Sequence, residues 1–131
     1  MLKLFYNMKI AIIGVTGMVG RTMLQVLKEL NFPVTELIPV ASEKSKGQII
    51  DFGGLSFPII TIEEALNKEI DIALFSAGGT LSLKYAPLFA EKGIKVIDNS
   101  SAWRMDPNIK LIIPEVNGHE LTKDDYIIAN P

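Results

Sequence analysis

Residues 9–20 of the chain read Lys-Ile-Ala-Ile-Ile-Gly-Val-Thr-Gly-Met-Val-Gly, and they are the strongest indication of the fold class. Its first half is an apolar, β-branched run that ends at a glycine, which predicts a strand over residues 9–13 that is buried on both faces. From Gly17 to about Leu30 the apolar residues recur at helical spacing instead, and the step Asn31-Phe32-Pro33 ends that helix. A strand that passes through a glycine-rich turn directly into a helix indicates the first unit of an α/β sheet.

The same alternation of apolar runs and helical patterns continues along the chain. Further strands are predicted over residues 34–41, 48–52, 55–60, 72–75, 94–97, 111–113 and 126–129. Helices are predicted over residues 62–67 and from Thr80, as N-cap, to about Lys92, with Pro87 expected to kink or break the second helix. This alternation implies parallel βαβ units. We therefore predict one α/β domain over residues 1–131, a doubly wound, mostly parallel Rossmann-type sheet with helices on both faces.

The composition excludes several classes of function. The 131 residues are 48% hydrophobic and 21% charged, which is typical of a globular domain, and a net charge of −2 excludes a dedicated basic surface for nucleic acid. With no cysteine and one histidine, these residues cannot form disulfides, a cysteine nucleophile or a multi-histidine metal site. The longest uncharged run, residues 72–83, is shorter than the roughly 20 residues that cross a bilayer. We expect a cytoplasmic domain without metal, membrane or nucleic-acid partners.

Four segments rich in glycine or serine follow predicted strands, and they point to a ligand site. They are residues 14–20, 41–47, 76–79 and 98–104. In doubly wound sheets, ligands bind in the crevice beyond the carboxyl ends of the strands. The sequence therefore predicts that any chemistry is concentrated at that edge of the sheet.

The first of these segments has the features of a phosphate-binding turn. Gly14 permits a tight turn, Gly17 lets the backbone approach a pyrophosphate, and Gly20 lets the helix pack closely on the strand. The N-terminus of the helix offers free N–H groups and a partial positive charge to a phosphate. The spacing is a variant of the dinucleotide fingerprint, and no Gly-Lys-Ser/Thr follows it, which disfavours a P-loop. The alternative is a glycine-rich turn without a ligand.

Two other segments bear on the cofactor. A cation near the end of the second strand accommodates the 2′-phosphate of NADP, whereas an acidic residue binds the ribose hydroxyl of NAD. Lys44 and Ser45 could bind that phosphate, so NADP is preferred, although a solvated surface loop is the alternative. Ser76 and Gly78 are small enough to leave room for a ligand against the backbone, or they serve a simple turn into the next helix.

The segment Asp98-Asn99-Ser100-Ser101-Ala102-Trp103-Arg104 combines hydroxyl and amide groups with an arginine. The guanidinium fork of Arg104 suits phosphate or carboxylate. Spacing alone slightly favours a different role, in which Arg104 pairs with Asp98 or Asp106 as a loop clamp. Farther along, Glu115 either supplies a carboxylate to the site or only follows a strand, and His119 is expected at the surface.

Taken together, these segments resemble a known enzyme family. Residues 14–20, Ser76-Ala-Gly-Gly79, Val96-Ile-Asp-Asn-Ser-Ser-Ala-Trp-Arg-Met-Asp106 and Ile113-Pro-Glu-Val-Asn117 occur in order and at familiar distances. They are similar to the N-terminal NAD(P)-binding domain of aspartate-semialdehyde dehydrogenase, from about Met8 to Pro131. The related N-acetyl-glutamyl-phosphate reductases share the fold and the glycine turn, but do not usually carry the Asp-Asn-Ser-Ser-Ala-x-Arg-Met run.

The resemblance implies an NADP-dependent, phosphate-requiring interconversion of aspartate semialdehyde and aspartyl phosphate, in the biosynthesis of diaminopimelate, lysine, threonine and methionine. It implies that the cofactor pyrophosphate is held by Thr16, Gly17, Met18 and Val19. Lys44 and Ser45 match an Arg-Ser pair that binds the 2′-phosphate, so the lysine is a departure that weakens selectivity for NADP.

For Arg104, the resemblance favours a role in binding the phosphate substrate over the loop clamp that spacing alone slightly favours. It implies that Arg104 binds inorganic phosphate or the acyl-phosphate group and that Asn99 lines the same pocket. It also implies a homodimeric parent enzyme.

The resemblance further implies that the catalytic residues are not in this chain. In the family, a cysteine that attacks the aldehyde follows the Ala129-Asn130-Pro131 step, and a histidine of a second domain acts as the base. We therefore expect a truncated domain that is inactive by itself and lacks the catalytic and dimerisation domain. The alternatives are a domain of an N-acetyl-glutamyl-phosphate reductase and a non-catalytic nucleotide-binding module.

Overall fold

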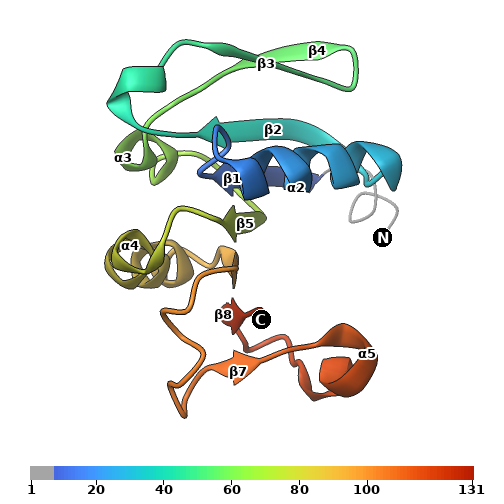
Figure 1. Cartoon of the computed structure of the whole chain (residues 1–131), viewed down its shortest axis with the longest axis vertical. Helices are drawn as coiled ribbons and strands as arrows, with labels where there is room; N and C mark the ends of the chain where they lie inside the picture. The colour runs from blue at the N-terminus through green and yellow to red at the C-terminus, as the bar shows by residue number, and fades with distance from the viewer. Residues whose placement is uncertain (1–7) are drawn as a thin grey trace.

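The centre of the structure is a parallel sheet. The computed structural model describes residues 8–131. Six strands form the sheet: β1 (Met8–Ile13), β2 (Val34–Val40), β5 (Ile72–Phe75), β6 (Lys95–Asp98), β7 (Lys110–Leu111) and β8 (Ile127–Ala129). Each pair of neighbours is parallel, and the order is β2-β1-β5-β6-β8-β7 (Figure 1). The chain runs first from β1 to β2 and later continues on the other side of β1, so the topological switch point lies between β1 and β5.

Helices cover both faces of this sheet. On one face lies α2 (Met18–Glu29), together with an antiparallel hairpin of β3 (Ile49–Phe52) and β4 (Leu55–Pro58). On the other face lie α3 (Ile62–Ala65) and α4 (Gly79–Glu91). The connections hold the short α5 (Pro114–Asn117) and two 3₁₀ turns, η1 (Glu43–Ser45) and η2 (Gly118–Glu120). The predicted doubly wound α/β fold is confirmed.

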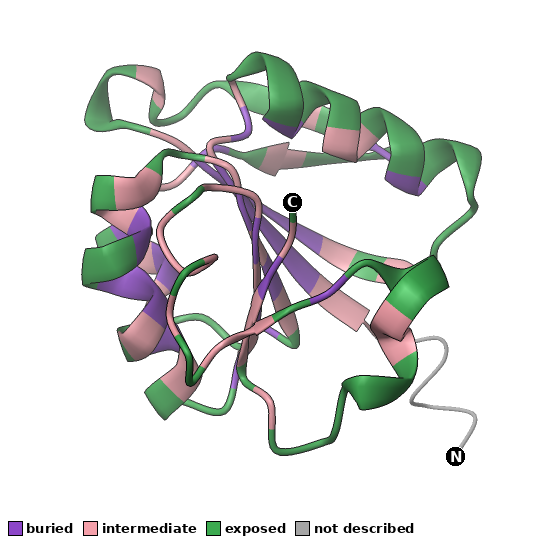
Figure 2. Ribbon diagram, turned by 60° about the horizontal axis from the view of Figure 1, so that its bottom comes forward, coloured by how far each residue is buried: buried purple, intermediate pink, exposed green. Residues whose placement is uncertain are grey.

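Strand β1 shows how the sequence builds a core on each face. Ala11 and Ile13 pack with α3 and α4, whereas Ile10 and Ile12 pack with α2 and the hairpin. All four residues are at most 1% exposed. Because successive side chains of a strand point to opposite faces, a strand covered on both faces needs an unbroken apolar run. Figure 2 shows the buried residues gathered along the strands and on the sides of the helices that face them.

Helix α4 differs from its predicted form at its first turn. The predicted N-cap, Thr80, is wrong: the N-cap is Gly78, with φ of +88°, and the helix begins at Gly79. A positive φ of this size favours glycine, so the helix begins two residues earlier than the threonine indicates. Helix α4 also continues through Pro87 to Glu91 without a break.

The turn from β1 into α2 brings three backbone segments together. Gly14 has a φ of +91°, and a Cβ on it would lie 2.2 Å from the carbonyl oxygen of Ser76, which follows β5. A Cβ on Gly20, inside α2, would lie 2.1 Å from the carbonyl oxygen of Gly14. Both positions therefore require glycine, Gly14 for the turn and Gly20 for the close packing of helix on strand.

We predict that Gly20→Ala destabilises the fold by about 2–3 kcal/mol, because the new methyl group meets backbone atoms that cannot move aside independently. Urea unfolding of the chain measures this loss. Gly118→Ala is the matched control, since a Cβ there would meet only Pro114 Cβ, at 3.9 Å. The control should change the unfolding free energy by no more than about 1 kcal/mol, and equal losses in the two variants would contradict the packing argument.

Candidate functional site

The loops that follow the strands are held side by side at one edge of the sheet. Each donates a backbone N–H to a carbonyl at the end of the neighbouring strand. These bonds are Gly14 N to Val40 O (2.9 Å), Ser76 N to Ile13 O (2.8 Å), Asn99 N to Phe75 O (2.9 Å) and Asn130 N to Asp98 O (2.9 Å). Three of the four segments predicted to carry the site are thereby joined in one row, and the fourth follows β2 at the same edge.

The N-terminus of α2 is open to a ligand. Its N-cap is Gly17, and no side chain caps the helix. Gly17, Met18 and Val19 are all exposed. The first N–H groups of a helix have no partner inside it, so these groups offer hydrogen bonds and a partial positive charge at this point.

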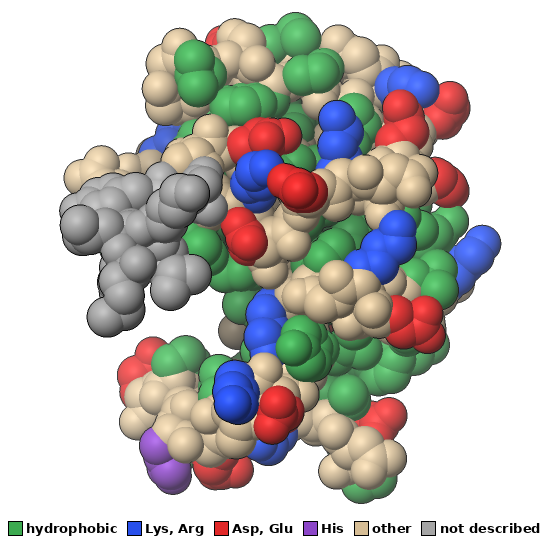
Figure 3. Space-filling view, turned by 180° about the vertical axis from the view of Figure 1, so that it is seen from behind, with side chains coloured by type: hydrophobic (Ala, Val, Ile, Leu, Met, Phe, Trp, Pro, Cys, Tyr) green, Lys and Arg blue, Asp and Glu red, His purple; other side chains and the backbone are tan. Residues whose placement is uncertain are grey.

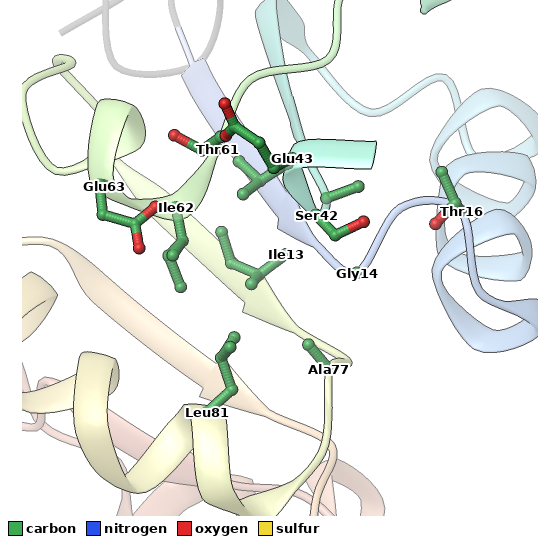
Figure 4. Close-up of a pocket in the computed structure, with 12 residues that line it drawn as sticks. Ile13, Gly14, Thr16, Ser42, Glu43, Thr61, Ile62, Glu63, Ala77 and Leu81 are labelled. Carbon is green, nitrogen blue, oxygen red and sulfur yellow. The ribbon is translucent and has the colours of Figure 1, made fainter. Parts of the chain in front are cut away.

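A cavity of about 410 Å³ opens beside this turn (Figure 4). Gly14 and Thr16 form one side of it, and Glu63, on α3, lies on the opposite side. Apolar side chains lie between the two sides. The complete lining is Ile13, Gly14, Thr16, Val40, Ala41, Ser42, Glu43, Thr61, Ile62, Glu63, Ala77 and Leu81.

The loop after β2 lines the cavity, but not with the two residues that were predicted to bind the 2′-phosphate. Ser42 and Glu43 line it, whereas the lining does not include Lys44 and Ser45, the next two residues of the loop. Lys44 is exposed and, within residues 8–131, forms no ion pair. The other lysine of the loop, Lys46, is paired with Glu64 at 2.9 Å. Lys44 is thus the cation of this loop that remains available to a ligand.

Two carboxylates of α3 are held in their ionised form. The hydrogen bond from Lys46 lowers the pKa of Glu64, and the backbone N–H and hydroxyl of Thr61 lower it further. The pKa of Glu63 is lowered by a hydrogen bond from its own backbone N–H and by the Tyr85 hydroxyl, which donates to Glu63 Oε1 at 2.8 Å. Both therefore carry a negative charge at neutral pH.

Arg104 is fixed at the same edge by backbone carbonyls. Its Nε donates to the carbonyl of Asn130 at 3.2 Å, and its Nη2 donates to that of Asn99 at 3.1 Å. The clamp favoured by spacing, with Asp98 or Asp106, is wrong, because within residues 8–131 Arg104 forms no ion pair. Carbonyls hold the guanidinium in place but do not neutralise its charge, so the edge keeps a positioned cation.

Hydrogen bonds to β6 and to α4 also hold the loop that carries Arg104 in place. The buried carboxylate of Asp98 accepts from the backbone N–H of Ser100 at 3.2 Å and from its hydroxyl at 2.6 Å. The indole N–H of Trp103 donates to the hydroxyl of Ser82, a fully buried residue of α4, at 2.9 Å. The loop therefore has one defined shape, set by β6 and α4.

A second cavity brings two predicted residues together. Val19, on α2, and Asn99, after β6, both line a groove of about 380 Å³ between α2 and the strands β5 and β6. Asn130 lines it as well. The groove connects the open helix terminus with the segment that holds Arg104.

Two other candidates lie apart from this edge. Glu115 is exposed on α5, where the side chain of Asn117 binds the backbone of Ile113 and Leu111. His119 is exposed, as predicted, and Figure 3 shows it at the surface of this peripheral segment. The same face mixes side chains of both charges.

Sequence reasoning missed the α3 side of the cavity. Thr61 and Glu64 form a capping box, in which the hydroxyl of Thr61 accepts from the backbone N–H of Glu64 at 3.3 Å. This spacing is readable in the sequence as a helix start. Nothing in the sequence indicates, however, that the helix lies opposite the glycine turn, because the two are more than forty residues apart.

Two further properties bear on the class of site. No group of three or more histidine, cysteine, aspartate or glutamate residues in the described part of the chain could hold a metal ion. No helix among residues 8–131 has the length and apolarity to cross a membrane.

The chain matches a model of the family described as semialdehyde dehydrogenase, NAD binding domain, over residues 9–124. It is 54% identical over 130 residues to aspartate-semialdehyde dehydrogenase of Aquifex aeolicus, an overlap that covers 94% of this chain and 37% of that protein. The chain thus spans well under half the length of the curated relatives it matches.

Solved structures agree in fold. The structure of aspartate semialdehyde dehydrogenase II from Vibrio cholerae, complexed with ASA, has a TM-score of 0.88 and 46% identity, over 95% of this chain and 42% of that one. Aspartate semialdehyde dehydrogenase with NADP from Candida albicans has a TM-score of 0.77 at 18% identity, over 94% of this chain and 42% of that one, which shows the fold alone.

Proposed function

Since the chain belongs to the semialdehyde dehydrogenase family as its NAD-binding domain, we propose that it is the cofactor- and phosphate-binding part of an aspartate-semialdehyde dehydrogenase. The parent enzyme would convert aspartate semialdehyde, phosphate and NADP⁺ to aspartyl phosphate, NADPH and a proton. The observation that carries the proposal is the row of loops at one edge. The open terminus of α2 lies at one end of it, and at the other lies Arg104, which forms no ion pair within residues 8–131. The relatives named above, all aspartate-semialdehyde dehydrogenases, support this substrate over an acetylglutamyl phosphate.

Gly17 gives the clearest support for a diphosphate at this turn. A Cβ on Gly17 would make only an ordinary contact of 3.5 Å with the Gly14 carbonyl, so the fold itself does not require glycine there. A ligand that approaches the backbone does require it. The N–H groups at Met18 and Val19 and the hydroxyl of Thr16 would hold the pyrophosphate of the cofactor. Gly17, whose own N–H donates to the Gly14 carbonyl at 3.1 Å, would let the pyrophosphate lie against the backbone.

From the pyrophosphate, the nicotinamide half would extend past Ser76 and Gly78 toward Asn99. Gly78 would border the cofactor, since it has no side chain to fill the space beside it. A Cβ there would meet no atom within 4 Å, so that space is free. When bound, the nicotinamide supplies the hydride acceptor. The chain contains no cysteine, so a cysteine nucleophile would come from outside these 131 residues.

We propose NADP as the cofactor, with Lys44 and Ser45 binding the 2′-phosphate. Among the described residues 8–131, Lys44 forms no ion pair with a carboxylate, whereas Lys46 is paired with Glu64. The preference over NAD would be moderate, because a lysine is a point charge and because the Glu43 carboxylate on the cavity wall disfavours a second anion.

At the other end of the row, Arg104 would bind inorganic phosphate or the acyl-phosphate group, with Asn99 beside it. Nε and one Nη2 hydrogen of Arg104 serve the two carbonyls, which leaves the remaining N–H groups of the guanidinium for an anion. The family resemblance also supports a cytoplasmic, homodimeric parent enzyme.

A fluorescence titration of the chain with NADPH tests the cofactor site. We expect saturable binding, and we expect Gly17→Ala to weaken it at least about tenfold, because each 1.4 kcal/mol of lost contact is a factor of ten. The same variant should lose no more than about 1 kcal/mol of stability, the usual effect of a poorer N-cap. No saturable binding at millimolar NADPH by the folded chain would contradict the proposal.

The assignment of the 2′-phosphate predicts a change in selectivity. Lys44→Glu should weaken the binding of NADPH by roughly tenfold or more and that of NADH much less, since a charge-assisted hydrogen bond is replaced by repulsion. Lys68→Glu makes the same change of charge at an exposed site outside the cavity lining and should leave both affinities as they are. Equal losses of NADPH and NADH in Lys44→Glu would refute the assignment.

The assignment of Arg104 is best measured by kinetics of the full-length parent enzyme. Arg104→Ala should raise the phosphate concentration needed for half-maximal rate by roughly ten- to a hundredfold, while nucleotide affinity stays within a factor of about two. Arg104→Lys should recover part of the loss, because it restores the charge without the fork. If the phosphate dependence of Arg104→Ala is unchanged, the residue has only a structural role.

A further inference from the structure

Apolar side chains line the side of the 410 Å³ cavity that lies opposite the glycine turn, and this part of the cavity is called the slot below. Ile13, Ile62 and Leu81 line it, and none of their side chains can hydrogen-bond. They come from β1, α3 and α4, so the slot exists only in the folded chain. At its end lies one charged side chain, Glu63, which projects toward the slot from α3 (Figure 4).

Glu63 is held in place from two directions. It lies in the first turn of α3, where negative charge is favoured by the helix dipole. Across the cavity wall, the hydroxyl of Tyr85 on α4 donates to Glu63 Oε1 at 2.8 Å, and the tyrosine itself is only 8% exposed. A hydrogen bond from the backbone N–H of Glu63 itself, and then the hydrogen bond from Tyr85, lower the pKa of the carboxyl group. The result is an oriented carboxylate, which at neutral pH accepts hydrogen bonds and cannot donate them.

We propose that Glu63 recognises the adenine base of the cofactor by accepting a hydrogen bond from its exocyclic amino group. The inference rests on the proposed nucleotide site, and it adds a specificity-determining residue to that site. The apolar side chains would contact the faces of the base, and the carboxylate would select among bases at the edge. A 6-oxo purine presents a carbonyl oxygen where adenine presents the amino group, so an acceptor-only residue would repel it.

The second carboxylate of the cavity occupies a different place. Glu43 begins η1, three residues after the end of β2, in the region that contacts the ribose in dinucleotide-binding folds. It receives no hydrogen bond from Tyr85, and within residues 8–131 it forms no ion pair. Glu43 is therefore a suitable control: it has the same charge in the same cavity, but it comes from the loop after β2 and lacks the hydrogen bond from Tyr85.

The test compares NADPH with its hypoxanthine analogue, in which an oxygen replaces the amino group. Dissociation constants are measured by fluorescence on the chain and its variants. The unmodified chain should prefer NADPH by about tenfold or more, the usual effect of one lost hydrogen bond to a charged group. In Glu63→Gln the preference should fall to within about threefold, since an amide can donate as well as accept. Glu43→Gln should keep the full preference.

Three outcomes would overturn the inference. If the unmodified chain binds both dinucleotides equally, Glu63 does not discriminate between the bases, although the chain still binds the nucleotide. If Glu63→Gln keeps the preference, another residue reads the base. If neither dinucleotide binds, the proposed function fails together with the inference. Tyr85→Phe is a second variant. It removes the hydrogen bond that orients the Glu63 carboxylate but leaves Glu63 in place, so the preference for NADPH over the hypoxanthine analogue should decrease.

Discussion

Gly14 lies between the carbonyl of Ser76 and the first turn of α2, and a residue with a Cβ does not fit there, because that atom would lie 2.2 Å from the Ser76 oxygen. This contact fixes where β1 ends relative to β5 and where α2 begins. The N-terminus of the helix is thereby left open at the edge of the sheet, next to the 410 Å³ cavity. If the turn moved outward to admit a side chain, Gly20 would lose its packing on Gly14 as well.

Charges are distributed unevenly along the edge that this contact defines. The cavity holds the carboxylates Glu43 and Glu63, whereas the cations Lys44 and Arg104 lie outside its lining. An anionic ligand group is favoured near the open helix terminus and near Arg104, and disfavoured at the α3 side of the cavity. A dinucleotide fits this distribution, because its phosphates and its base differ in charge along one molecule.

Much of the fold could be predicted from patterns that span a few residues. The unbroken apolar run before Gly14 predicted a strand covered on both faces, and Ile10 to Ile13 are indeed buried between two cores. The start of α4 could not be predicted in this way. Thr80 is a good N-cap by type, yet Gly78 takes that position, because the backbone there needs a positive φ to leave β5.

The α/β class, the glycine turn and the loops that meet at one edge could all be predicted from the amino-acid sequence, because each depends on neighbouring residues and on a general rule of parallel sheets. Which residues face one another across the cavity became known from the three-dimensional structure. It placed Glu63 and Tyr85, 22 positions apart, in one hydrogen bond, and it gave Arg104 backbone carbonyls in place of an aspartate. Such pairings depend on the packing of separate elements, and no local pattern encodes them.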